Sequence, residues 1–297
     1  MRSDISFESA GSLCRGWFYP AKGVKGAAPA IVMSHGITAV KEQYLDRYAE
    51  QFAAEGYAVL VFDYRHLGSS DGTPRGRVNP RLQQDDVRAA LTWIGKHPTV
   101  DPKRIALWGS SFSGAHAIVV GALDPRVRVV VVQVPALDIP RSLIALIGRD
   151  GFSNLLQLLA DDHAARNAGA EGAGIPVVAA AGETCFLPRP DAYEWFTQTG
   201  RTIAPRWLNQ ISLESIARCA EYVPDSLIHL ISPKPFLMQV AKGDSLIPFE
   251  VSQAAFARAG EPKRLEVYDC GHFDPYAVEP WHGQFIKGQI AWLQAHL

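Results

Sequence analysis

Three serines lie close together in residues 106–116, which read ALWGSSFSGAH. An apolar run precedes them and a helical pattern follows, so the stretch predicts a strand, a sharp turn and a helix. Such a turn presents a serine hydroxyl at the carboxyl end of a strand, where it can act as a nucleophile. The spacing approaches the pattern G-x-S-x-G, but a serine stands where the final glycine is expected.

The size of the flanking residues selects one serine of the three. Positions two before and two after the nucleophile must be small, because strand and helix close on each other there. Trp108 occupies the first of these positions for Ser110, and Ser113 would lie one turn inside the helix. Ser111 is flanked by Gly109 and Ser113, so Ser111 is the predicted nucleophile. The hydroxyls of Ser110 and Ser113 are expected to cap the helix.

A base is needed to take the proton of the serine hydroxyl. Among the nine histidines, His272 in VYDCGHFD follows the last strand pattern and a glycine, on a loop expected to reach Ser111. His116 is interpreted as a filler of the helix after the serines. His35 is a weaker candidate for the base.

An acid that orients the base is expected after another strand. Asp244 follows the apolar run in FLMQVAKGDSLIP and is the first choice. Asp138 follows the preceding strand pattern and remains an alternative, because some hydrolases carry the acid there. The order serine, acid, histidine along the chain is informative, whereas each residue alone is a weak signal.

Backbone N–H groups are the expected donors to the oxyanion of an acyl-transfer intermediate. Phe112 follows the serine at the start of the helix, where free N–H groups favour negative charge. The second predicted donor is Ile37, in the loop SHGITAV after the first buried strand. His35 and Gly36 are expected to shape this loop.

The elements that must position these residues alternate along the chain. A hairpin across Ala10-Gly11 comes first, and apolar strand patterns then alternate with helical patterns. The strand patterns cover residues 27–36, 57–65, 104–111, 126–135, 234–241 and 263–269. Strands that are apolar on both faces predict a parallel sheet covered by helices on both sides.

The alternation stops between about Ala136 and Ser232. Residues 141–148 and 152–167 read as helices, which predicts a mainly helical cap at 135–232 inserted into a core of 1–134 and 233–297. An additional layer over the sheet is the alternative to a cap. Four aromatic residues of this segment are candidates for the substrate pocket or for the interior of the cap, namely Phe186, Trp195, Phe196 and Trp207.

The composition argues against several classes of protein. The 297 residues carry a formal charge of −1 and no cluster of Lys or Arg, so binding to nucleic acid or an anionic membrane is not expected. The beginning of the chain shows no apolar signal region, and no stretch approaches a membrane span. The four cysteines have no metal-binding spacing, which favours reduced thiols and a cytoplasmic location. Homo-oligomer formation stays open.

Five motifs together resemble the serine α/β-hydrolase superfamily over nearly the whole chain: SHG, FDYRHLGSSDG, GSSFSG, GDSLIP and GHF. More narrowly, the chain is similar to capped bacterial hydrolases like dienelactone hydrolase and acetylxylan esterase. The resemblance implies an α/β-hydrolase fold and a mostly parallel central sheet. It also implies hydrolysis of a small or medium hydrophobic or aromatic ester or lactone, without metal or organic cofactor. His66 departs from the usual motif, in which Asp63 and Arg65 are expected to be structural charges.

Other functions share the same serine, acid and histidine. An acyltransferase, a thioesterase or a carbon–carbon bond hydrolase would differ only in the group that reaches the acyl-enzyme. A peptidase of the prolyl type shares the serine turn, but no acidic pair for a peptide amine is visible in the pattern. A binding protein on the same fold is a further alternative, against which the intact set of three residues argues.

Overall fold

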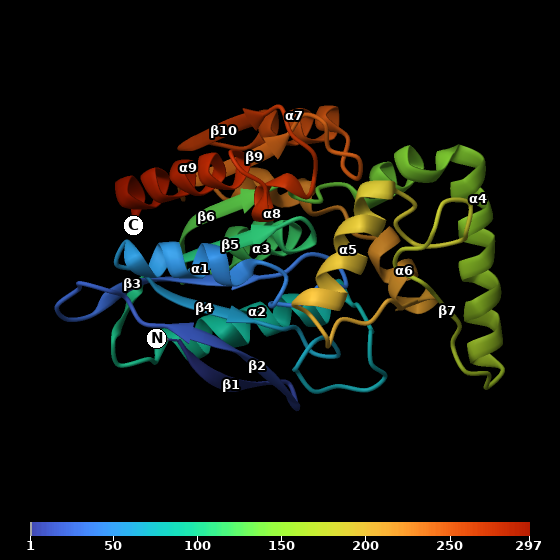
Figure 1. The fold of residues 1–297 in the computed structure, drawn as a ribbon, viewed down its shortest axis with the longest axis horizontal. Helices are drawn as coiled ribbons and strands as arrows, with labels where there is room; N and C mark the ends of the chain where they lie inside the picture. The colour runs from blue at the N-terminus through green and yellow to red at the C-terminus, as the bar shows by residue number, and fades with distance from the viewer. Residues whose placement is uncertain (1) are drawn as a thin grey trace.

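The computed structural model describes residues 2–297, and an eight-stranded sheet forms its centre (Figure 1). The strand order is β1-β2-β4-β3-β5-β6-β9-β10. β2 pairs antiparallel with β1 and β4, and all the other pairs are parallel. The strands are β1 (Ser3–Ser9), β2 (Ser12–Tyr19), β3 (Ala28–Ser34), β4 (Ala58–Phe62), β5 (Val100–Ser110), β6 (Val127–Gln133), β9 (Phe236–Ala241) and β10 (Lys263–Tyr268).

The predicted hairpin is confirmed as β1 and β2. Its two turn residues, Ala10 and Gly11, have φ angles of 45° and 81°. Two consecutive positive φ angles match the right-handed twist of the paired strands, which is why such two-residue turns connect hairpins.

Both faces of the parallel part of the sheet are buried. Val129 and Val131 pack in one apolar cluster with α1 and α9, whereas Val130 and Val132 pack in another with α2, α3 and α7. Because successive side chains of a strand point to opposite faces, a continuous apolar strand needs helices on both sides. These helices are α1 (Leu45–Ala54), α2 (Pro80–Gly95), α3 (Phe112–Leu123), α7 (Phe249–Arg258), α8 (Asp274–Ala277) and α9 (Trp281–His296). The predicted α/β class is confirmed.

Local sequence signals set the start of α2. The Asn79 side chain caps α2 by accepting hydrogen bonds from the N–H groups of Arg81 and Leu82, at 3.0 and 3.3 Å. Pro80 occupies the first helical position, where its missing N–H costs nothing. These contacts fix the start of a helix that covers the sheet beside α3.

The segment between β6 and β9 lies together at one end of the sheet, where β6 leads into α4 (Figure 1). It contains α4 (Ile139–Asn167), β7 (Gly174–Ile175), α5 (Pro190–Thr202), β8 (Ile211–Ser212), α6 (Leu213–Ala220) and the 3-10 helix η1 (Pro224–Leu230). We call residues 134–235 the inserted segment. η1 packs on α3 and α7, so the boundary between a core and a cap stays a prediction.

The two helices predicted for residues 141–148 and 152–167 both lie within α4, and Gly148 interrupts the element between them. Gly148 has non-helical angles of φ 75° and ψ 170°, so α4 bends there. Of the helices in residues 2–297, α4 is long and apolar enough to cross a membrane by length and composition alone. This finding differs from the expectation that no stretch approaches a membrane span. Only 11% of the most apolar 18-residue window of α4 is buried.

Candidate functional site

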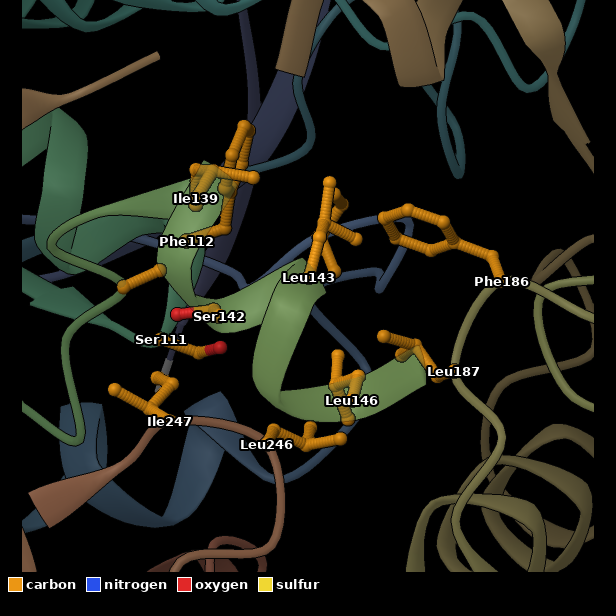
Figure 2. Close-up of a pocket in the computed structure, with 12 residues that line it drawn as sticks. Ser111, Phe112, Ile139, Ser142, Leu143, Leu146, Phe186, Leu187, Leu246 and Ile247 are labelled. Atoms are coloured by element: carbon orange, nitrogen blue, oxygen red, sulfur yellow. The ribbon is translucent and has the colours of Figure 1, made fainter. Parts of the chain in front are cut away.

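Ser111 occupies a strained turn between β5 and α3. Its φ of 55° and ψ of −119° cost a non-glycine residue about 1–3 kcal/mol. A Cβ atom on Gly109 would lie 2.2 Å from the carbonyl oxygen of Ser113, so only glycine fits at 109. The strained turn presents the Ser111 hydroxyl to a cavity below α4 (Figure 2).

The neighbouring serines have structural contacts, but the expectation that their hydroxyls cap the helix is wrong, because neither accepts a hydrogen bond from an N–H group of α3 in residues 2–297. Ser113 Oγ accepts a hydrogen bond from the N–H of Ser110 at 2.8 Å and donates to the carbonyl oxygen of Ser34 at 2.6 Å. Ser110 Oγ lies 2.6 Å from the hydroxyl of Tyr276 and accepts a hydrogen bond from Gln133 at 3.1 Å. The serine in place of the usual glycine therefore ties the turn to β3.

His272 connects Ser111 to Asp244. Its Nε2 atom lies 3.1 Å from Ser111 Oγ, and its Nδ1 atom lies 2.7 Å from Asp244 Oδ2. With the proton on Nδ1, the ring donates to Asp244 and leaves Nε2 to accept the serine proton. The three side chains thus form the hydrogen-bonded chain that nucleophilic catalysis requires.

The structure distinguishes the two candidate acids by their contacts. Asp244 Oδ1 accepts hydrogen bonds from the N–H groups of Leu246 and Ile247 at 2.9 and 2.8 Å, while Oδ2 faces His272. Asp138 instead caps α4 through the N–H of Arg141 at 3.0 Å. Asp244 is therefore the residue that the fold brings to His272.

Two backbone N–H groups beside Ser111 are free to bind an oxyanion. In residues 2–297, neither the N–H of Ile37 nor that of Phe112 donates to another group. Phe112 is the first residue of α3, where an N–H has no partner within the helix. Gly36 brings the other loop close, because a Cβ there would lie 3.3 Å from the Cβ of Ser111.

A buried ion pair holds the loop that carries Ile37. Lys41 Nζ lies 2.6 Å from Asp63 Oδ2, and the N–H of Lys41 donates to Asp63 Oδ1 at 2.8 Å. Burial raises the pKa of Asp63, but the charge and the hydrogen bonds of Lys41 outweigh burial and hold this pKa below its usual value. Burial lowers the pKa of His35, so this ring is neutral and shapes the loop, as expected for a structural residue.

Two cavities meet at Ser111. The larger spans about 450 Å³, part of it open to solvent, and has an almost wholly apolar wall, which includes Leu143, Leu146, Phe186, Leu187, Leu246 and Ile247 (Figure 2). The smaller spans about 270 Å³, also partly open to solvent, and has an aromatic wall of Trp195, Phe196, Phe273 and Tyr276, beside His272.

The aromatic residues predicted for the pocket separate into three groups. Phe186 lines the larger cavity, and Trp195 and Phe196 line the smaller one. Trp207 lines neither, because it stacks on Phe196 with ring centres 5.2 Å apart and an angle of 23°. The expectation that Trp207 lines the pocket is therefore wrong, since Phe196 provides the wall in front of it.

Several other residues that line the two cavities were not predicted from the sequence. Leu143 and Leu146 belong to a helix whose apolar pattern is the same whether it faces a cavity or a packed interior. Phe273 and Tyr276 could have been predicted to lie near the site, because they follow the candidate base His272 by one and four residues.

Helix α5 contacts three segments near the site, which lie beyond the Ile37 loop, beside Asp244 and beside His272. Gln43, beyond the Ile37 loop, donates to Thr199 Oγ1 at 2.6 Å. Ser245, beside the candidate acid, donates to an Asp191 oxygen at 2.7 Å. Trp195 stacks on Phe273 with ring centres 5.0 Å apart, next to the candidate base. The inserted segment therefore bridges the loops of the sheet through one helix.

Nearby groups offer no competing nucleophile or metal site. Burial raises the pKa of Cys270 to about 12, so this side chain is a thiol at neutral pH. Across residues 2–297, no three or more His, Cys, Asp and Glu side chains gather where they could hold a metal ion.

Curated relatives align with most of the chain. The quorum-quenching protein AidA of Acinetobacter baumannii (strain MDR-ZJ06) is 31% identical over 297 residues, covering 98% of this chain and 94% of the relative. The thiohydrolase apmlB of Arthrinium phaeospermum is 32% identical over 272 residues, or 89% and 86% of the two chains. The polyketide transferase grgF of Penicillium sp is 30% identical over 277 residues, or 92% and 90%.

Solved structures agree with the fold. The crystal structure of the α/β-hydrolase GrgF from Penicillium sp. sh18 superposes with a TM-score of 0.85 and 29% identity, covering 100% of this chain and 99% of that one. The model of the family described as X-Pro dipeptidyl-peptidase (S15 family) matches residues 17–219. The protein is thus a hydrolase-type enzyme, and the chain belongs to the S15 family of the α/β-hydrolases.

Proposed function

We propose that the protein is a serine hydrolase of carboxylic esters or lactones, with an acyl-enzyme formed on Ser111. The observation that carries the proposal is the chain of contacts from Ser111 Oγ through His272 to Asp244, at 3.1 and 2.7 Å. Such a chain supplies a nucleophile, a base and a group that orients the base.

In the proposed reaction, Ser111 Oγ attacks the carbonyl carbon while His272 Nε2 takes the serine proton. The N–H groups of Ile37 and Phe112 bind the oxyanion. His272 then gives the proton to the leaving oxygen, and the acyl group stays on Ser111. Water then attacks the acyl carbon while His272 takes its proton, and His272 returns this proton to Ser111 Oγ as the bond from Oγ to the acyl carbon breaks and the acid leaves.

The lining of the two cavities favours an apolar acyl group. No Asp or Glu among residues 2–297 lines either cavity, whereas a dipeptidyl-peptidase needs an anion to hold the free amine of its substrate. An ester or lactone with an aliphatic acyl chain fits the larger cavity better than a peptide does.

Acyl transfer or thioester cleavage is the second candidate function. Ser111 is only 8% exposed, and the cavities beside it are mostly apolar, so water has limited access to an acyl-enzyme. The names of the relatives apmlB and grgF, a thiohydrolase and a polyketide transferase, support this alternative.

A panel of hexanoyl esters, hexanoyl thioesters and medium-ring lactones tests the proposal. The wild-type protein should cleave at least one ester or lactone, and Ser111→Ala should lower kcat by at least about 10⁴-fold. Product analysis with and without an added alcohol measures transfer against hydrolysis. Turnover that survives Ser111→Ala would sink the proposed function.

A further inference from the structure

Ser111 and His272 come from loops whose strands are not neighbours in the sheet. In the order β5-β6-β9-β10, two strands separate β5, which leads to Ser111, from β10, which leads to His272. At the usual strand spacing, the ends of β5 and β10 lie roughly 14 Å apart. Strand pairing alone therefore does not set the 3.1 Å contact between Ser111 Oγ and His272 Nε2, and direct contacts between the two loops must hold it.

Tyr276 provides a second contact between the same two loops. It follows His272 by four residues, on α8, and its hydroxyl group lies 2.6 Å from the hydroxyl group of Ser110, the residue before Ser111. Both side chains are buried, with 4% of Tyr276 and 0% of Ser110 exposed. A hydrogen bond in such a buried setting is stronger than one in water, so it holds the two loops at a defined distance.

The Ser110 end of this bond is fixed by a buried polar network. Gln133, at the end of β6, donates from Nε2 to Ser110 Oγ at 3.1 Å. Gln133 Oε1 accepts a hydrogen bond from Gln289 Nε2 at 2.9 Å, and Gln289 Oε1 accepts one from Trp108 Nε1 at 2.9 Å. The Tyr276 hydroxyl therefore binds a group that β5, β6 and α9 together hold in place.

The Tyr276 end of the bond is joined to His272 by a compact turn. The N–H of Tyr276 donates to the carbonyl oxygen of Phe273 at 3.2 Å. The N–H of Gly271 donates to Asp274 Oδ2 at 2.7 Å. These hydrogen bonds close the segment from Gly271 to Tyr276 on itself, so a shift of Tyr276 also shifts His272.

On the basis of the proposed function, we propose that Tyr276 is a positioning residue for proton transfer between Ser111 and His272. Its hydrogen bond to Ser110 holds the loop of His272 against the turn of Ser111. His272 Nε2 then stays within reach of Ser111 Oγ while the proton moves from Oγ to Nε2. Tyr276 itself gives no proton to the substrate and acts through His272.

The variant Tyr276→Phe tests this role, because it removes the hydroxyl and keeps the ring that lines the smaller cavity. We expect kcat for a hexanoyl ester and the rate of fluorophosphonate labelling of Ser111 to fall roughly tenfold, since both need His272 to take the serine proton. KM should stay within about twofold, because the walls of the cavities are unchanged.

Two double variants show whether the effect passes through the proposed contacts. Ser110→Ala removes the other end of the bond, and adding Tyr276→Phe to it should lower the labelling rate by less than about twofold. In His272→Ala the base is absent, so adding Tyr276→Phe should leave the residual labelling rate unchanged. A general loss of structure would lower the rate in both backgrounds.

Tyr64→Phe is the matched control. The hydroxyl of Tyr64 donates to Ser34 Oγ at 2.6 Å, and both side chains are buried, as in the pair of Tyr276 and Ser110. Ser34 ends β3, which pairs directly with β4, and the bond does not join the loop of His272 to Ser111. Tyr64→Phe should lower the melting temperature about as much as Tyr276→Phe does, but keep kcat and the labelling rate within about twofold.

Three results overturn the proposal: wild-type kcat and labelling rates in Tyr276→Phe, an equal fall of these rates in Tyr64→Phe, or losses from Tyr276→Phe and Ser110→Ala that multiply. Failure of the proposed function gives a different pattern. In that case the wild-type protein cleaves no ester, thioester or lactone of the panel, or turnover persists in Ser111→Ala. Normal, Ser111-dependent turnover with unchanged rates in Tyr276→Phe contradicts only the role of Tyr276.

Discussion

The loops of the sheet and the inserted segment build their parts of the site in different ways. The loops hold the reacting groups by hydrogen bonds, such as those from Leu246 and Ile247 to Asp244. The inserted segment contributes mainly apolar walls, and it contains the unpaired indole N–H groups of Trp195 and Trp207.

This difference separates the chemistry from the choice of substrate. Hydrogen bonds with short, directed geometry fix atoms to within tenths of an ångström, as proton transfer requires. Apolar walls specify size and shape, and they tolerate changes that keep the volume. Changes in the loops should therefore affect rate or stability, whereas changes in the inserted segment should affect preference.

The largest expected effect comes from the acid in a sheet loop. Asp244→Asn keeps the shape but favours the wrong tautomer of His272, so kcat should fall about 10³–10⁴-fold. Ester hydrolysis measures the loss. Asp138→Asn is the control and should keep kcat within a few-fold, because Asp138 only caps α4. Equal losses in the two variants would contradict the assignment of the acid.

The second effect concerns the contribution to the free energy of unfolding of His116, which lies on α3 and contacts the inserted segment. His116 contacts Tyr222 and Gln83, and burial lowers its pKa from 6.5 to about 3. Below pH 6.5 the unfolded chain binds a proton here that the folded chain does not. The free energy of unfolding should therefore fall as the pH drops from 6.5 to 3, by about 2–3 kcal/mol at pH 4.5 from this group.

Urea unfolding of His116→Asn measures this contribution. The variant should be less stable at pH 7 but should lose less stability than the wild type between pH 6.5 and 4.5. If the free energies of unfolding of the two proteins fall equally between pH 6.5 and 4.5, His116 does not titrate as its burial requires.

The third effect tests the serine in place of the motif glycine. Ser113→Gly creates G-x-S-x-G but removes the bonds of Ser113 Oγ to Ser34 and Ser110. The free energy of unfolding should fall by about 1–2 kcal/mol. Chemical denaturation measures this fall, and Ser113→Ala separates the lost hydroxyl from the added backbone freedom. A more stable Ser113→Gly protein would contradict the structural role.

The smallest effect is a change of preference in the inserted segment. Leu143→Ala enlarges the larger cavity at Ser111 and should favour longer acyl chains by about tenfold in kcat/KM, measured with butanoyl to decanoyl esters. Leu159→Ala on the same helix is the control, because Leu159 is buried but does not line the cavity. A shift in both variants would mean that stability, and not cavity size, sets the preference.

The arrangement of the reacting groups follows from the sequence because topology restricts it. Parallel strands end at a common edge, so residues just after β5, β9 and β10 must lie near one another. Ser111, Asp244 and His272 occupy these positions, and the structure brings them together. Their catalytic roles remain predictions until activity is measured.

The walls of the site were less predictable because they depend on tertiary packing. Leu143 and Leu159 give the same apolar signal on α4, yet only Leu143 faces the cavity. Trp195 and Trp207 are both tryptophans, so the sequence does not show which of them lines the smaller cavity. In the structure Trp195 lines it, whereas Trp207 stacks on Phe196.

The central claim is that Ser111 forms the acyl-enzyme, and covalent labelling tests it most directly. The wild-type protein is treated with a fluorophosphonate, and fragment-ion mass spectrometry of the peptide across β5 and α3 locates the adduct. We predict a single adduct on Ser111, no adduct in Ser111→Ala, and much slower labelling in His272→Ala. An adduct on Ser110 or Ser113, or no labelling of an active preparation, would contradict the account.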